Sequence, residues 1–196
     1  MYRPFHIKSE IRVLAIDDSA LIADQIMIVG AFFRGGGWLD GVMRSYVTRD
    51  GMDSTDTIAE MILSSKHCGQ IRIIMLDGVT YAGFNPVDIH HIWELTGIPV
   101  VAVMRSYPNF RKIEDALFHL PEPQKRMGII LRAGGITKVR TGAGPNHVYI
   151  QCAGIEAQHA ARIVQLTATR SNIPEPLRVA HLIATGIVLG ESRGKA

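Results

Sequence analysis

Apolar residues come in short runs through the first half of the chain, and each run is closed by polar or turn-forming residues. The runs at 11–18 and 71–78 each carry an almost continuous apolar stretch before their closing acids, which is typical of strands covered on both faces of a sheet. The segments 24–33 and 38–50 flank the turn RGGG at 34–37, where glycine supplies the positive φ that a hairpin tip requires. The pattern predicts five strands, at 11–18, 24–33, 38–50, 71–78 and 98–105.

Helical signals separate and follow these strands. A cluster of N-capping residues opens the segment 53–67, and the segment 85–97 has Pro86 near its start and Gly97 at its end. Later in the chain we predict two strands, at 135–142 and 147–154, and three helices, at 109–120, 155–170 and 176–190. The order β-β-β-α-β-α-β followed by helices is that of a ribonuclease H-like α/β fold. Its mixed sheet would begin with an antiparallel three-strand meander, continue with parallel strands and carry helices on both faces.

Composition narrows the class of protein. The chain has 196 residues, of which 47% are hydrophobic and 20% charged, so we expect one globular domain spanning 1–196. The excess of 21 Lys and Arg over 18 Asp and Glu permits a nucleic-acid partner without demanding one. Cys68 and Cys152 show no CxxC spacing, which argues against a disulfide framework and a cysteine zinc site. Because no signal peptide or membrane-spanning run is visible, we expect a cytoplasmic protein without a membrane partner.

Aspartates close three of the predicted strands. Asp17 and Asp18 end the first, Asp50 the third and Asp77 the fourth. A single strand-end acid is most simply a turn or cap residue, but these three strands would run the same way and end at one edge of the sheet. Adjacent strands lie ~4.8 Å apart, so carboxylates there can share Mg²⁺, with Mn²⁺ as the alternative. Strand alternation places Asp17 and Asp18 on opposite faces and leaves open which of them faces Asp77.

Four segments carry a family resemblance. They are VLAIDDS, VTRDGMDSTDTIAEMI, the long stretch from IIMLDG to VVAVMR, and NIPEPLRVAHLIA. They resemble the endonuclease V superfamily, in particular its archaeal branch that includes endonuclease dU. The resemblance implies metal ligands at Asp17, Asp50 and Asp77, and a catalytic histidine at His181 that completes the site. Without it, His181 on the apolar face of its helix would be interpreted as a core residue.

The sequence departs from that family where substrate would bind. Asp50 replaces a glutamate that is one methylene longer, and Asp53 is the neighbouring alternative. The family's Pro-Tyr-Ile-Pro wedge is replaced by FRGGGWLDG between the second and third strands. We interpret Arg34 and Trp38 of this hairpin as substrate-binding residues, because tryptophan can stack on a base while arginine neutralises a phosphate. Arg105 stands in place of a family lysine and is predicted to contact a phosphate.

The strand-end acids predict a Mg²⁺-dependent site, and the resemblance implies an endonuclease that cleaves phosphodiester bonds near deaminated bases, in DNA repair, with DNA favoured over RNA. The metal would activate water and stabilise the charge that develops on the phosphate. One alternative is a nucleic-acid-binding protein of the same fold without catalysis, which the shortened Asp50 supports. Another is a Mg²⁺-binding receiver-like signalling domain, suggested by AIDDSALIADQI, although the interval from Asp18 to Asp77 is long for it. A phosphate-binding loop at 142–147 is disfavoured by Pro145.

Overall fold

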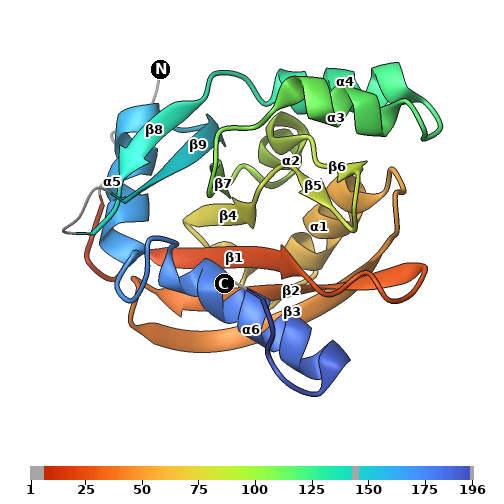
Figure 1. The fold of residues 1–196 in the computed structure, drawn as a ribbon. Helices are drawn as coiled ribbons and strands as arrows, with labels where there is room; N and C mark the ends of the chain where they lie inside the picture. The colour runs from red at the N-terminus through yellow and green to blue at the C-terminus, as the bar shows by residue number, and fades with distance from the viewer. Residues whose placement is uncertain (1–6, 143–145, 195–196) are drawn as a thin grey trace.

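A seven-stranded mixed sheet runs through the centre of the protein in the computed structural model, which describes residues 7–142 and 146–194 (Figure 1). The sheet strands are β1 Arg12–Asp18, β2 Gln25–Arg34, β3 Trp38–Thr48, β4 Ile73–Asp77, β7 Val100–Met104, β8 Thr137–Arg140 and β9 His147–Ala153. A separate small hairpin consists of β5 Thr80–Tyr81 and β6 Asn85–Pro86. The helices are α1 Ser54–Leu63, α2 Ile89–Thr96, α3 Phe110–Leu117, α4 Pro123–Arg132, α5 Ala157–Thr167 and α6 Glu175–Leu189, with a short 3₁₀ turn at Cys68–Gln70.

The strand order β3-β2-β1-β4-β7-β9-β8 confirms the predicted meander and the parallel strands that follow it. β1 pairs antiparallel with β2, and β2 with β3, while β4 joins β1 in parallel and β7 joins β4 in parallel. The antiparallel strands β9 and β8 extend the sheet beyond β7. A receiver domain has an all-parallel sheet of the flavodoxin type, so this topology excludes the signalling alternative.

Helices cover both faces of the sheet, as predicted (Figure 1). One apolar layer lies between the sheet and the helices α1 to α4, and it buries Ile58, Ile92 and Ile130. The other lies under α5 and α6, and it buries Ile163 and Leu177. Alternate residues of β1 and β4 enter opposite layers, which explains why both strands are apolar at consecutive positions. Within the described ranges, no helix has both the length and the hydropathy needed to cross a bilayer.

The region between residues 85 and 132 differs from the sequence prediction at two helices. α2 begins at Ile89, later than expected, because the Asp88 carboxylate accepts hydrogen bonds from the backbone N–H groups of His90 and His91. α4 was not predicted, because Pro121 and Pro123 follow the predicted helix at 109–120 and favour a break there. Pro123 starts this helix, where its missing N–H is tolerated. In the loop 142–147, residues 143–145 lie outside the described residues.

Candidate active site

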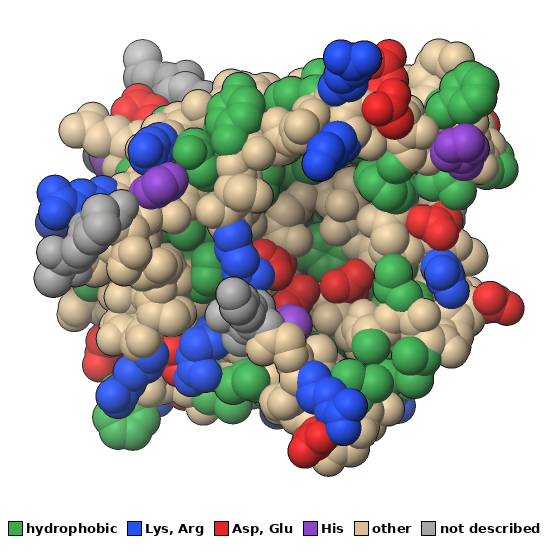
Figure 2. All heavy atoms as spheres, viewed as in Figure 1, with side chains coloured by type: hydrophobic (Ala, Val, Ile, Leu, Met, Phe, Trp, Pro, Cys, Tyr) green, Lys and Arg blue, Asp and Glu red, His purple; other side chains and the backbone are tan. Residues whose placement is uncertain are grey.

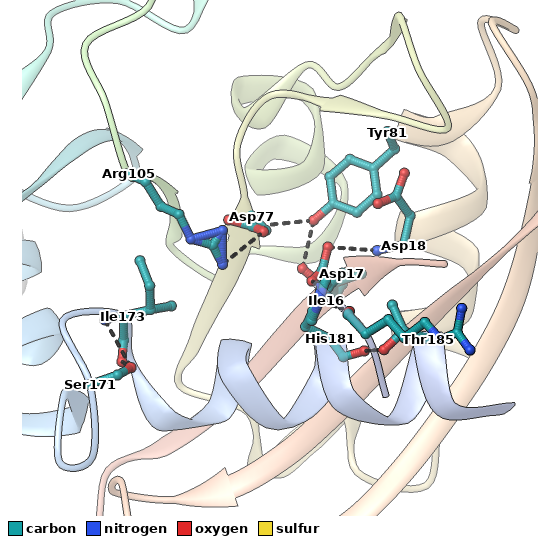
Figure 3. A network of polar contacts seen from close by, with 11 residues as sticks. Ile16, Asp17, Asp18, Asp77, Tyr81, Arg105, Ser171, Ile173, His181 and Thr185 are labelled. Carbon is teal, nitrogen blue, oxygen red and sulfur yellow. Dashed lines mark hydrogen bonds and ion pairs between the residues drawn. The ribbon is translucent and has the colours of Figure 1, made fainter. Parts of the chain in front are cut away.

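The parallel register of β1 and β4 brings Asp17 and Asp77 side by side. Ile16 is paired with Leu76 in this ladder, so the next residue of each strand is an aspartate. Neighbours in a parallel ladder point to the same face, and these two point to the face that α6 covers (Figure 3). The register therefore selects Asp17 over Asp18 as the partner of Asp77.

The helix α6 supplies an imidazole to this pair. His181 Nδ1 lies 2.9 Å from Asp17 Oδ2 (Figure 3). His181 Nε2 lies 3.1 Å from the backbone oxygen of Arg193. A carbonyl oxygen only accepts hydrogen bonds, so Nε2 carries a hydrogen. Two bare acceptors would repel each other across the Nδ1–Oδ2 contact. His181 and Asp17 therefore share one further proton there.

Burial raises the pKa values of the acids at this site. Asp17 is 4% exposed, and desolvation raises its pKa to about 7, with the negative charges of Asp77 and Asp18 acting in the same direction and the hydrogen bond to His181 against it. Burial also raises the pKa of Asp77, although the positive charge of Arg105, 3.7 Å away, opposes this. The pKa of His181 is raised, mainly by its hydrogen bond with Asp17. Asp17 and His181 therefore keep their shared proton at every pH up to near neutrality.

Tyr81 holds the ends of β1 and β4 and was missed in the sequence analysis. Its side chain is fully buried, and its hydroxyl donates to the backbone oxygen of Ile16 at 2.7 Å and accepts from the backbone N–H of Asp77 at 3.1 Å (Figure 3). The hydroxyl thus bridges β1 and β4 at a position where a direct ladder hydrogen bond would otherwise join the two strands. Tyr81 returns to this position through the β5–β6 hairpin, a contact that no local sequence pattern signals.

Asp50 does not join the Asp17–Asp77 pair, in contrast to the sequence prediction. Its carboxylate accepts a hydrogen bond from the backbone N–H of Phe84 at 2.8 Å, and it lies against Gly83, where a side chain would clash. Among the described residues, it belongs to no group of three or more His, Cys, Asp or Glu side chains that could hold a metal ion. Asp50 therefore anchors the loop that carries Tyr81.

The other acids near this loop also bind backbone or side-chain groups. Asp18 accepts a hydrogen bond from the backbone N–H of Ala82 at 2.5 Å. Asp53 accepts hydrogen bonds from Thr48 and from the Asn85 side chain. Asp53, the predicted alternative to Asp50, therefore has a structural role.

Arg34 and Trp38 lie at the opposite end of the strands, so the structure does not bring these two predicted substrate-binding residues to the acids. β2 runs antiparallel to β1, with Arg34 opposite Arg12 and Ile28 opposite Asp18. The hairpin tip therefore projects beyond the start of β1, while the acids are at its end. Arg34 is paired with Asp40 at 2.7 Å. Of the three predicted substrate-binding residues, only Arg105 lies at the site.

A pocket opens next to Asp77 at the same edge of the sheet. Its volume is about 230 Å³. Figure 2 shows this face of the molecule hollowed, with acidic side chains at the centre of the hollow and Lys and Arg side chains around it. The lining combines backbone, apolar, aromatic and amide groups, from residues that include Gly78, Thr80, Phe84, Met104, Arg105, Phe110 and Gln151.

The donor chemistry of the acid pair fits a divalent cation. Asp17 and Asp77 offer oxygen ligands from adjacent strand ends, and a cation between them would relieve the repulsion that helps to raise the pKa of Asp17. Across residues 7–142 and 146–194, no group of three or more His, Cys, Asp or Glu side chains converges in a metal-binding arrangement. The protein would therefore contribute two carboxylates, and water would complete the coordination.

The sequence matches the profile of one family, endonuclease dU, over residues 9–188. The chain belongs to the endonuclease dU family. A UPF0215 protein of Methanosarcina barkeri is 59% identical over 192 residues, which are 98% of each chain. A UPF0215 protein of Methanothermobacter thermautotrophicus is 50% identical and covers 97% of this chain and 94% of its own. The residues matched to the family include Asp17, Asp77, Tyr81, Arg105 and His181.

Solved structures confirm the fold. A protein of unknown function from Archaeoglobus fulgidus superposes with a TM-score of 0.83 at 36% identity, covering 90% of this chain and 98% of its own. Endonuclease V of Ciona intestinalis, solved with an inosine-containing DNA, gives a TM-score of 0.60 at 12% identity over 91% of this chain and 86% of its own. Human endonuclease V gives 0.56 at 16% identity over 90% and 83%. The fold is ribonuclease H-like, and membership of the endonuclease dU family supports a nuclease.

Proposed function

We propose that this protein is a divalent-metal-dependent endonuclease that cleaves a phosphodiester bond near a deaminated base, with DNA as its substrate. The observation that carries the proposal is the acid pair of buried Asp17 and half-buried Asp77, side by side at the strand ends with His181 against Asp17. Burying two acids together costs folding free energy unless a cation joins them. Membership of the endonuclease dU family supports the nuclease activity itself.

Each group at the site has a task that follows from its contacts. Asp17 and Asp77 would hold Mg²⁺ or Mn²⁺, which when bound supplies an activated water and stabilises charge on the phosphate. Arg105 lies beside Asp77 and is partly exposed, so its guanidinium can bind a phosphate oxygen. His181 Nδ1 already faces Asp17 Oδ2, so it can take the proton that leaves this oxygen when the carboxyl ionises.

The pocket beside Asp77 supports recognition of a single base. Phe84 and Phe110 contribute flat apolar surface, and Gln151 contributes an amide. The Gln151 Nε2 donates to the backbone oxygen of Gly134 at 2.8 Å, which fixes the orientation of that amide. A deaminated base carries an N–H next to a C=O where its parent carries a ring nitrogen next to an amino group, and a fixed amide can distinguish the two. We infer that a base turned out of its strand enters this pocket.

Cleavage assays test the proposal. Single- and double-stranded oligonucleotides of one sequence would carry uracil, hypoxanthine or xanthine at a central position, in DNA and in RNA, beside their unmodified parents. We expect cleavage of a modified DNA strand with Mg²⁺ or Mn²⁺ and none in EDTA. Cleavage that persists in EDTA would overturn the metal dependence, and the absence of cleavage on every strand with both metals would overturn the nuclease.

A second candidate, a nucleic-acid-binding protein without catalysis, is favoured by one observation. Asp50 is bound to the loop at Phe84, so the third predicted acid is not beside Asp17 and Asp77. Binding of the same oligonucleotides without cleavage under any metal condition would identify this function. Isothermal titration with Mg²⁺ alone adds a readout that does not depend on activity, because a binder without catalysis has no need of the metal.

A further inference from the structure

A strip of aromatic and basic side chains leads away from the pocket, and the function proposed above does not use it. It consists of Tyr107, Tyr149 and His147, flanked on β8 by Lys138 and Arg140. We propose that this aromatic strip binds an unpaired nucleic-acid strand, the continuation of the strand whose base enters the pocket. This inference rests on the proposed function for the identity of the substrate, and on its own geometry for the binding surface.

The strip is continuous with the candidate site. Phe110 lines the pocket, and its ring meets Tyr107 edge to face, with centroids 6.5 Å apart. Tyr107 meets Tyr149 at 5.5 Å, and Tyr149 meets His147 at 5.3 Å. On β9, Tyr149 lies opposite Met104, the last residue of β7, whose neighbour is Arg105. The ring contacts therefore connect the pocket wall to the outer strands of the sheet without interruption.

The orientation of the rings leaves aromatic surface for a ligand. The interplanar angles along the strip are 85°, 82° and 87°, so in each contact the edge of one ring meets the face of the other and no two neighbouring rings are stacked face to face. Tyr107 is 58% exposed. A base can stack on a ring face that has no aromatic neighbour, and such stacking accepts any base, because every base has a flat π surface.

Two cations share this face of the sheet. β8 pairs with β9 so that Lys138 lies opposite Tyr149 and Arg140 lies opposite His147. Directly opposed residues of an antiparallel pair project to the same side, and both basic residues are exposed. Aromatic rings that alternate with Lys and Arg are the surface that single-stranded nucleic acid prefers, since the rings take bases and the cations take phosphates. An acidic protein segment would use the cations but would not need the row of rings.

Binding to a labelled oligonucleotide without metal tests the strip separately from catalysis. The probe is a fluorescent single-stranded DNA of ordinary bases, measured by anisotropy in EDTA, with the duplex of the same sequence as the comparison. We expect Tyr107→Ala to weaken single-strand binding by about 5- to 150-fold and Tyr107→Phe to restore it. Lys138→Ala should weaken binding and lower the slope of log affinity against log salt by about 0.7. Trp38→Ala is the matched control, an exposed aromatic at the far end of the strands, and should bind like the wild type.

The possible results test the aromatic strip, the nuclease activity and the preference for an unpaired strand separately. Wild-type protein that does not bind single strands, or Tyr107→Ala that binds like wild type, overturns the strip even if modified DNA is cleaved. Single-strand binding that depends on Tyr107, in a protein that cleaves nothing, supports the strip and overturns the nuclease. An equal loss on duplex and on single strands, or equal displacement of the probe by polyglutamate, would overturn the assignment to an unpaired strand. Tyr107 is too exposed for its truncation to unfold the protein, which thermal melting of each variant verifies.

Discussion

The two ends of the central strands carry the same kinds of side chain in opposite settings. At the hairpin end, Arg34 pairs with Asp40 at the surface, and Trp38 beside them is 67% exposed. At the other end, Asp17 is almost shut off from water, Asp77 is half-buried, and the two face one imidazole and one partly exposed arginine. An acid, a cation and an aromatic ring are thus present at both ends, and what distinguishes the second end is a second acid, Asp17, that is buried beside the first.

This difference shows which charges are informative about function. An exposed ion pair is screened by water and contributes little to folding, so a protein can gain or lose it freely. A buried acid beside a second acid destabilises the fold, and it persists where a ligand or a reaction requires it. Residue type alone made the hairpin look like a binding surface, while solvent exclusion marks the strand ends as the candidate site.

Asp77→Asn should have the largest effect of the substitutions that test this comparison. The amide keeps the shape of the side chain but lacks the charge that a metal ligand needs, so we expect metal-dependent cleavage to be lost. Removing one negative charge also relieves repulsion at Asp17, so the melting temperature in EDTA should stay level or rise. Asp40→Asn at the hairpin end is the control and should cleave normally. A marked fall of the melting temperature of Asp77→Asn in EDTA would make Asp77 a structural residue.

The next largest effect concerns how the stability of the wild type and of Asp17→Asn changes with pH. The pKa of Asp17 rises from 3.8 to about 7 on folding, and that of His181 also rises, so the folded protein binds more protons than the unfolded chain across this range. The contribution of Asp17 and His181 to stability without metal therefore falls as the pH increases from about 4 to about 7. We expect this loss to be on the order of 2 kcal/mol larger in the wild type than in Asp17→Asn.

Urea unfolding in EDTA at a series of pH values measures that loss, and parallel curves for the two proteins would contradict it. Affinity for Mg²⁺ should increase over the same pH range, because the metal must displace the proton shared by Asp17 and His181. Titration calorimetry in buffers of different ionisation enthalpy would show whether this proton leaves the protein or stays on His181.

Tyr81→Phe should have a smaller, mixed effect. Losing the hydroxyl leaves the backbone oxygen of Ile16 and the N–H of Asp77 without their partner, which costs about 1–3 kcal/mol of unfolding free energy. Because this hydroxyl also sets the position of Asp77, we expect metal affinity or cleavage to fall by about 10- to 100-fold. Tyr46→Phe, an exposed hydroxyl bonded to Arg44, is the matched control for both measurements. A loss of stability with unchanged metal affinity would restrict Tyr81 to the fold.

Trp38→Ala should have the smallest effect. The side chain is exposed at the hairpin end, so both the free energy of unfolding and the affinity for nucleic acid should change by no more than about 0.5 kcal/mol. Denaturant unfolding and anisotropy on the same preparation check both quantities. Weaker binding by this variant would restore the hairpin as a substrate surface and remove the contrast between the two ends.

The local patterns in the sequence predicted most of the framework. Strand β1 and strand β4 were visible as apolar runs that end in acids, and the three glycines at 35–37 marked the β2–β3 turn. The helix α4 was missed because a proline that can start a helix was interpreted as the end of one. These signals depend on neighbours a few positions apart, so periodicity and turn chemistry are enough to detect them.

The sequence by itself thus determined the fold class, the strand-end acids and the histidine that the family resemblance singled out. Only the tertiary structure decided which acids meet. The register of β1 against β4 places Asp17 beside Asp77. The Asp50 carboxylate instead accepts a hydrogen bond from the backbone of the β5–β6 loop, and the Tyr81 hydroxyl from the same hairpin binds between the two strands. Register and loop contacts join residues tens of positions apart, and their energies depend on geometry that no short stretch of sequence contains.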